Sequence, residues 1–144
     1  MRRLILPAVL AASAAVLSTA PAQARETTIL PGYWEYTTSS VGGSGTDRRC
    51  IRPEEIEHFI QSPGTRHYHC TYPEHSIGGG RASYRGVCVS KHGQSYPVTL
   101  TGTYSPTTLD LKGSARPIAS LPLTLPATIK GRRISATCPT EAKD

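Results

Sequence analysis

Apolar and polar residues alternate along the middle of the chain, from Tyr84 to Gly113. In the central run, alternate positions are apolar or glycine, and serine, proline and threonine fill the positions between them. The apolar or glycine positions are Tyr96, Val98, Leu100, Gly102 and Tyr104. Successive side chains of a strand point to opposite faces of its sheet, so this pattern predicts a strand with one buried and one solvated face. Shorter runs around Val87–Val89 and Leu109–Leu111 lie on either side, beyond turn residues. We therefore expect an antiparallel meander of three strands.

Two further alternating runs precede the meander. Residues 33–38 place Trp34 and Tyr36 on one face, and residues 66–72 place Tyr68, Cys70 and Tyr72 on one face. The predicted fold class is mainly β: a single curved antiparallel meander or partial barrel with one short docked helix, stapled by disulfides.

The short helix is predicted over residues 53–61. Pro53 suits the first helical position, and the glutamates that follow it suit the positive end of the helix dipole. Ile56, Phe59 and Ile60 form one apolar stripe. A helix of about nine residues does not persist alone in water, so we expect this stripe to dock on the sheet.

Two strands are expected after the meander. Pro122 and Pro126 have the same parity in the run 121–126, so both missing N–H groups would lie on one side, as in an edge strand. In the last run, 128–138, Ile129 and Ile134 have opposite parity, and a bulge near Gly131 would bring them to one face.

Residues 1–24 have the parts of a secretory signal peptide. Arg2 and Arg3 give a basic start, an apolar run follows from Leu4 to Leu17, and small residues two apart end at Ala24. The apolar run is too short for a transmembrane span. We expect cleavage near Ala24, which leaves residues 25–144 as a single β-rich domain, periplasmic or secreted.

All four cysteines fall in the expected mature chain, and they are Cys50, Cys70, Cys88 and Cys138. Because no Cys-x-x-Cys pair is present, two disulfides are favoured over a zinc site in an oxidising compartment. We expect Cys50–Cys70, which would clamp the helix, together with Cys88–Cys138, which would tie the meander to the last strand. The alternative is Cys70–Cys88 across a hairpin centred on Gly79, which leaves Cys50 to Cys138.

The histidines offer an enzymatic alternative. His67 and His69 lie two apart on one strand face, with His75 nearby, and could hold one metal. That face is the expected solvent face, and no nearby carboxylate completes a ligand set. We predict no metal and no cofactor, and keep a metal-dependent or hydrolytic enzyme using His67 and His69 as an alternative.

The basic residues offer a second alternative. Removing Arg2 and Arg3 with the signal peptide lowers the formal net charge from +6 to +4, a mild excess that does not indicate nucleic acid binding. Arginines could still attach the protein to anionic envelope lipid, and the candidates are Arg48, Arg49, Arg52, Arg132 and Arg133.

Several motifs recur in the order seen in a known family. They are Pro31-Gly32-Tyr33-Trp34-Glu35, Cys50-Ile51-Arg52-Pro53-Glu54-Glu55, two mid-chain cysteines, and Gly131-Arg132-Arg133-Ile134 before Cys138. With the signal peptide, this set resembles the small exported bacterial proteins of domain of unknown function 3617. The resemblance implies an exported, disulfide-bearing β domain and carries no established activity.

Five aromatic side chains are expected either to fill the core or to line an apolar pocket: Trp34, Tyr36, Tyr68, Tyr96 and Tyr104. The favoured interpretation is a non-catalytic binding or structural role in the cell envelope. Its partner would be an envelope protein or a small apolar ligand.

Overall fold

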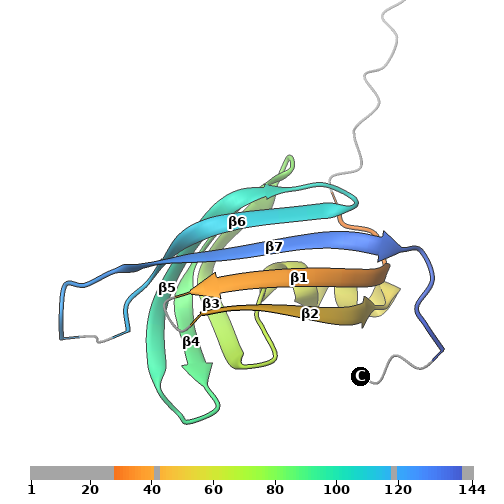
Figure 1. The fold of residues 1–144 in the computed structure, drawn as a ribbon. Coiled ribbons are helices and arrows are strands. Elements are labelled where there is room, and N and C mark those ends of the chain that lie inside the picture. Colours follow the sequence, from red (N-terminus) through yellow and green to blue (C-terminus); the bar gives the residue numbers. More distant parts are fainter. Residues whose placement is uncertain (1–27, 41–42, 118–119, 141–144) are drawn as a thin grey trace, which may run out of the picture.

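The fold is built on one open antiparallel β-sheet (Figure 1). The structure, a computed structural model, describes residues 28–40, 43–117 and 120–140, so the expected signal peptide lies outside the described residues. Seven strands are described: β1 (Gly32–Ser40), β2 (Gly43–Ile51), β3 (Tyr68–Gly78), β4 (Arg81–Ser90), β5 (Ser95–Tyr104), β6 (Thr108–Ala115) and β7 (Leu125–Ser135). Their order is β2-β1-β7-β6-β5-β4-β3, and the outer strands β2 and β3 do not pair with each other.

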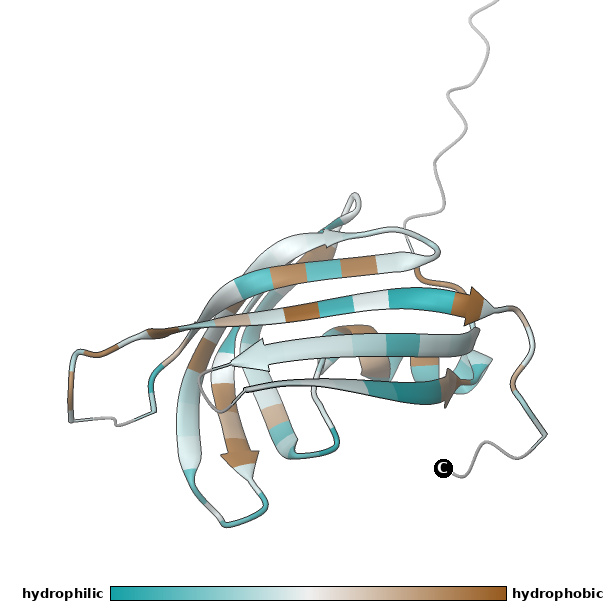
Figure 2. Ribbon diagram, in the orientation of Figure 1, coloured by the Kyte–Doolittle hydropathy of each residue, from teal (hydrophilic) through white to brown (hydrophobic). Residues whose placement is uncertain are grey.

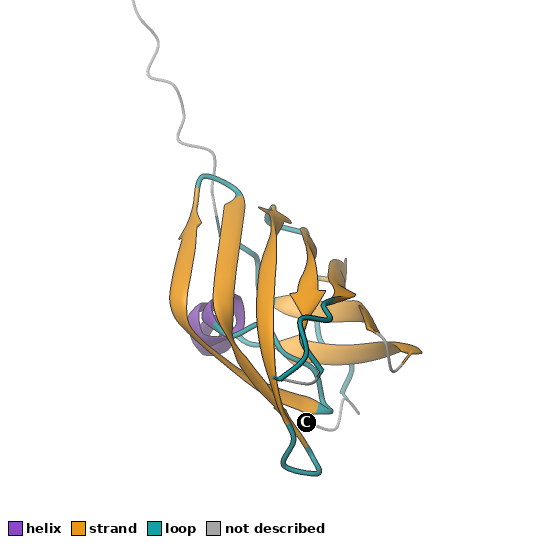
Figure 3. Ribbon diagram, turned by 90° about the vertical axis from the view of Figure 1, so that its left-hand side faces the viewer, coloured by secondary structure: helices purple, strands orange, loops and turns teal. Residues whose placement is uncertain are grey.

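The sheet curves strongly, so that β3 to β5 run across the direction of β1, β2 and β7 (Figure 3). Three glycines on the inner face of neighbouring strands explain this curvature. An added Cβ would overlap the carbonyl oxygen of Thr71 at Gly86, that of Asp110 at Gly102 and that of Thr99 at Gly113. Neighbouring backbones therefore approach more closely at these positions than any side chain would allow.

The inner face carries the core, as the alternation predicted. Val98, Leu100, Leu109 and Leu111 are buried there, and apolar and polar residues alternate along β6 (Figure 2). The three-strand meander predicted from sequence is confirmed as β4, β5 and β6.

The predicted helix is also confirmed. A 3₁₀ turn, η1 (Pro53–Glu55), leads into α1 (Ile56–Gln61), and Phe59 lies 6 % exposed against the rings of Trp34 and Tyr36. Ring-centroid distances of 6.4 and 5.2 Å are those of aromatic pairs in contact. The helix thus fills one end of the concave face.

The expected disulfide pairing is wrong. The structure has Cys50–Cys138 and Cys70–Cys88, the alternative, in place of Cys50–Cys70 and Cys88–Cys138. Cys70 and Cys88 are opposed in the β3–β4 hairpin, where Gly79 and Gly80 make the turn with positive φ. A bulge between Thr71 and Glu74 shifts the register of the hairpin between its turn and the Cys70–Cys88 pair.

The helix needs no disulfide because tyrosine side chains hold its C-terminal end. The Tyr84 hydroxyl donates a hydrogen bond to the Ile60 carbonyl at 2.7 Å, and the Tyr72 hydroxyl donates one to the Pro63 carbonyl at 2.9 Å. Burial raises the pKa of Tyr72 to about 12, so this donor keeps its proton at physiological pH.

Two expectations for the C-terminal part are corrected. Residues 121–124 form no strand, β7 begins at Leu125, and Leu121 and Leu123 are about half exposed. Proline alternating with leucine here marks a connection, because Pro122 has no N–H to give to a ladder. The bulge lies at Ile134, between the pairs Trp34–Arg133 and Tyr33–Ser135, and Ile134 is left exposed.

Candidate functional site

A cavity of about 310 Å³ lies on the concave face, and no residue of α1 lines it. Its lining comes from the ends of β1, β4 and β6 and from the starts of β3, β5 and β7. Apolar side chains dominate this lining: Tyr68, Tyr72, Tyr96, Val98, Leu100, Ala115, Leu125, Ala127, Ile129 and the Cys70–Cys88 disulfide. A site of this size and composition suits a small apolar molecule.

The structure divides the five predicted aromatic residues into two groups. Tyr68 and Tyr96 line the cavity and meet edge to face, with ring centroids 5.9 Å apart. Trp34, Tyr36 and Tyr104 are buried in the core, each at most 7 % exposed. Trp34 is fixed there by its indole N–H, which donates to the Leu30 carbonyl at 3.0 Å.

The aliphatic residues that line the cavity were not predicted from the sequence. Ala115, Leu125, Ala127 and Ile129 come from β6 and β7, and β7 pairs on its other side with β1. The alternation in residues 125–129 predicts which side chains share a face of the strand, but it does not predict which strands lie next to it.

The three histidines are not brought together around a pocket. His69 is exposed on the outer face of β3, His67 lies just before that strand, and His75 lies beyond the bulge. One ring nitrogen of His75, Nδ1, lies 2.8 Å from the Tyr72 carbonyl. No group of three His, Cys, Asp or Glu side chains among the described residues is close enough to hold a metal ion.

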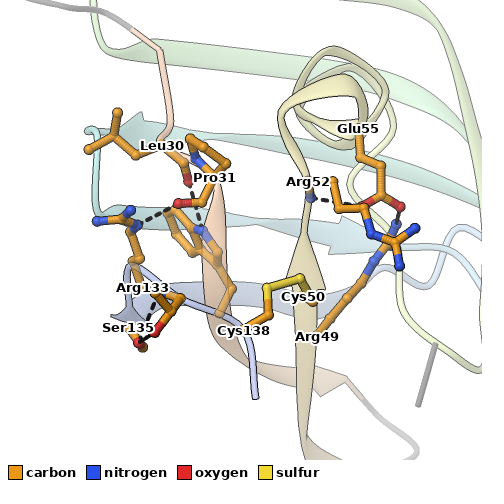
Figure 4. Close-up of a disulfide and its surroundings, with 11 residues drawn as sticks. Leu30, Pro31, Arg49, Cys50, Arg52, Glu55, Arg133, Ser135 and Cys138 are labelled. Atoms are coloured by element: carbon orange, nitrogen blue, oxygen red, sulfur yellow. Dashed lines mark hydrogen bonds and ion pairs between the residues drawn. A yellow bond between two sulfur atoms is a disulfide. The ribbon is translucent and has the colours of Figure 1, made fainter. Parts of the chain in front are cut away.

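A second, larger groove of about 1110 Å³ lies beside the cavity, between the unpaired edges of β2 and β3. Its lining includes polar residues of β2 and of the helix region, among them Arg49 and Glu55, whose ion pair at 3.4 Å is drawn in Figure 4. Glu55 also accepts a hydrogen bond from the backbone N–H of Arg52 at 2.8 Å. This bond, followed by the nearby Arg49 charge, lowers the pKa of Glu55.

The candidate lipid-binding arginines do not form one patch. Arg48 and Arg132 both pair with Glu35, at 2.8 and 2.7 Å, on the outer face of the sheet. Arg133 donates instead to the Pro31 carbonyl at 2.8 Å, beside the Cys50–Cys138 disulfide (Figure 4). Arg49 and Arg52 line the groove, as does Arg48, whereas Arg132 and Arg133 do not.

The Glu35 ion pairs predict a pH-dependent contribution to stability. Hydrogen bonds from Arg132 and then Arg48 lower the pKa of Glu35 below its ordinary value of 4.5. Stability from these pairs is therefore complete above pH 4.5 and is lost as the pH falls through the lower, folded-state value. Glu35→Gln is expected to lower the Tm at pH 7 and to leave it nearly unchanged at pH 2, as measured by circular dichroism.

Glu74→Gln is the matched control, because Glu74 is 72 % exposed and its only described ion pair, with Arg85, is long at 3.8 Å. Its effect on the Tm should be near zero at both values of pH, since exposed pairs contribute little. A Glu35→Gln deficit that persists at pH 2 would contradict the ion-pair explanation.

Together these features define a mainly β, disulfide-linked protein with a strongly curved open sheet, and with a helix and an apolar cavity on its concave face. The chain belongs to the family described as protein of unknown function (DUF3617), which matches residues 29–138. The family resemblance drawn from the sequence motifs is thus confirmed.

Comparison with curated proteins gave no match, and comparison with solved structures gave none. In the part of the chain that the structure describes, no helix is long and apolar enough to cross a membrane.

Proposed function

We propose that this protein is an exported, non-catalytic binding protein of the cell envelope, which holds a small apolar ligand in the cavity of its concave face. The observation that carries the proposal is the cavity itself. The helix fills one part of the concave face, whereas another part keeps about 310 Å³ unfilled among apolar side chains. Ligand pockets begin at about 300 Å³ and are lined mainly by apolar and aromatic side chains, as this one is.

Export rests on the sequence of residues 1–24, and the two disulfides support it. Disulfides persist in oxidising compartments such as the periplasm or the extracellular space. The scarcity of charged side chains in the cavity favours binding over catalysis, because acid–base and nucleophilic chemistry require ionisable groups at the reacting centre.

Binding can be tested with the uncharged fluorescent probe N-phenyl-1-naphthylamine. The wild-type protein is expected to bind it saturably with a blue shift, because the ring system leaves water for the cavity. Ala127→Trp is expected to abolish most of this binding, since Ala127 lines the cavity and an indole would occupy it. Leu125→Trp, at the start of β7, is a second blocking variant should the first fold poorly.

Thr101→Trp is the matched control, because Thr101 is exposed on the outer face of β5. It adds the same side chain outside the cavity and should leave probe binding unchanged. The proposal is overturned if the wild-type protein binds no probe, or if folded Ala127→Trp and Leu125→Trp bind it as tightly as the wild type.

A further inference from the structure

The apolar cavity and the polar groove adjoin. Both are lined by Thr38, Gly64, Thr65, Tyr68 and Cys70. These five residues form the rim between the two spaces, and a molecule that occupied both would cross it. The two spaces differ in chemistry, because the cavity is lined mainly by apolar side chains and the groove includes several charged ones.

The groove carries an excess of positive charge. Arg49, Arg52 and Arg66 line it together with Arg48, whose charge is paired with Glu35, and the carboxylates in the lining are those of Asp47 and Glu55. Their ion-pair partners hold Arg49 and Arg66 only loosely: Arg49 lies 3.4 Å from Glu55, and Arg66 lies 3.9 Å from Asp47. Both guanidiniums are at least half exposed. Such exposed pairs contribute little to stability, so their donors can turn to an anion at little cost.

A buried hydroxyl group in this groove has no partner among the described residues. Tyr36 lines the groove and is 7 % exposed, and its hydroxyl oxygen makes no hydrogen bond with any described group. A buried donor of this kind destabilises the fold if it is left unpaired, so a ligand that accepts its hydrogen bond is favoured. Burial raises the pKa of Tyr36, with smaller and opposite effects from Arg49 and Glu55, so the group keeps its proton and can donate.

We propose that the ligand is a single-chain anionic amphiphile, whose alkyl chain fills the cavity and whose anionic head lies in the groove near Tyr36, Arg49 and Arg66. This inference rests on the proposed function and adds the chemistry of the ligand to it. A carboxylate and a phosphate monoester share the required head-group chemistry, since both accept hydrogen bonds from guanidinium and hydroxyl donors. The rim residues lie where the chain and the head of such a molecule would meet.

The test is displacement of bound N-phenyl-1-naphthylamine by four decyl compounds of equal chain length. Decanoate and decyl phosphate carry the proposed heads, decanol is uncharged, and decylammonium is cationic. We expect the better of the two anions to displace the probe at about ten-fold lower concentration than decanol, the effect of one charge-assisted hydrogen bond. Decylammonium should be weaker than decanol. The tighter of the two anions identifies the head group.

Two variants test the head-group site. Arg49→Gln combined with Arg66→Gln, and separately Tyr36→Phe, should weaken binding of the anions about ten-fold while leaving decanol unchanged. Arg85→Gln combined with Arg116→Gln is the matched control, because it removes the same charge from exposed arginines that do not line the groove. Tyr36→Phe should not lower the Tm, since it removes only the unpaired hydroxyl.

The inference is overturned, with the proposed function intact, if decanol displaces the probe as well as both anions. It is also overturned if both groove variants bind the anions like the wild type, or if the control pair weakens the anions equally. If neither the probe nor any decyl compound binds, the proposed function fails and this inference fails with it.

Discussion

Replacing Gly113 by alanine is expected to destabilise the protein severely, by about 3 kcal/mol or more, and Gly102→Ala should act in the same way. The added methyl group would overlap the Thr99 carbonyl oxygen at Gly113 and the Asp110 carbonyl oxygen at Gly102. Both obstacles are backbone atoms of the neighbouring strand, so no side chain can move aside. Relief requires the two strands to separate and the ladder hydrogen bonds between them to weaken.

Urea denaturation followed by circular dichroism measures this loss, and Gly45→Ala is the matched control. Gly45 also lies in a strand, but an added Cβ there meets nothing within 4 Å. Its replacement should change the free energy of unfolding by less than about 1 kcal/mol, or raise it slightly. If Gly113→Ala and Gly45→Ala have the same effect, glycine is not required at position 113 for the close approach of the two strands.

The second large effect concerns the disulfides. In a variant that keeps only Cys50–Cys138, reduction is expected to lower the free energy of unfolding by about 4–5 kcal/mol. In a variant that keeps only Cys70–Cys88, reduction should cost about 3 kcal/mol. The difference follows from the sequence separations of 88 and 18 residues, because a longer loop loses more chain entropy in the unfolded state when it is closed.

In each variant, both cysteines of the other disulfide are replaced by alanine. Each variant is measured with and without dithiothreitol, so that the packing effects of alanine cancel within each pair of measurements. A small domain has only about 5–15 kcal/mol of stability, so reduction of the longer loop should unfold a large fraction of the protein near body temperature. Equal costs for the two disulfides would contradict the loop-closure explanation. A peptide that joins Cys50 to Cys70 would contradict the pairing itself.

The sequence predicted local features well and the relations between distant strands poorly. The alternation from Tyr96 to Tyr104 placed each side chain on its correct face, because a half-buried strand allows no other pattern. The helix at residues 53–61 was found from its proline, its acidic first turn and its apolar stripe. In each case the physical cause lies within a few residues of its signal.

The disulfide pairing was not predicted because the sequence left it between two plausible local arguments. Clamping the helix and spanning the hairpin are both sufficient reasons for a bond, but hydrogen bonds from Tyr72 and Tyr84 already hold the end of the helix. The full lining of the cavity was not predicted for a related reason. Its lining combines the start of β7 with the end of β1, and only the sheet order places them side by side.

The Cys50–Cys138 disulfide spans three neighbouring strands, because β1 lies between β2 and β7 and the chain after β7 crosses the end of β1 (Figure 4). In covalent terms the chain between these cysteines is a closed ring, and the Cys70–Cys88 hairpin is a smaller ring within it. A protease that cuts the exposed connection at Leu121–Thr124 would open the larger ring without dividing the molecule. Such a nicked protein would keep its mass, apart from one added water, until a reductant released its two pieces.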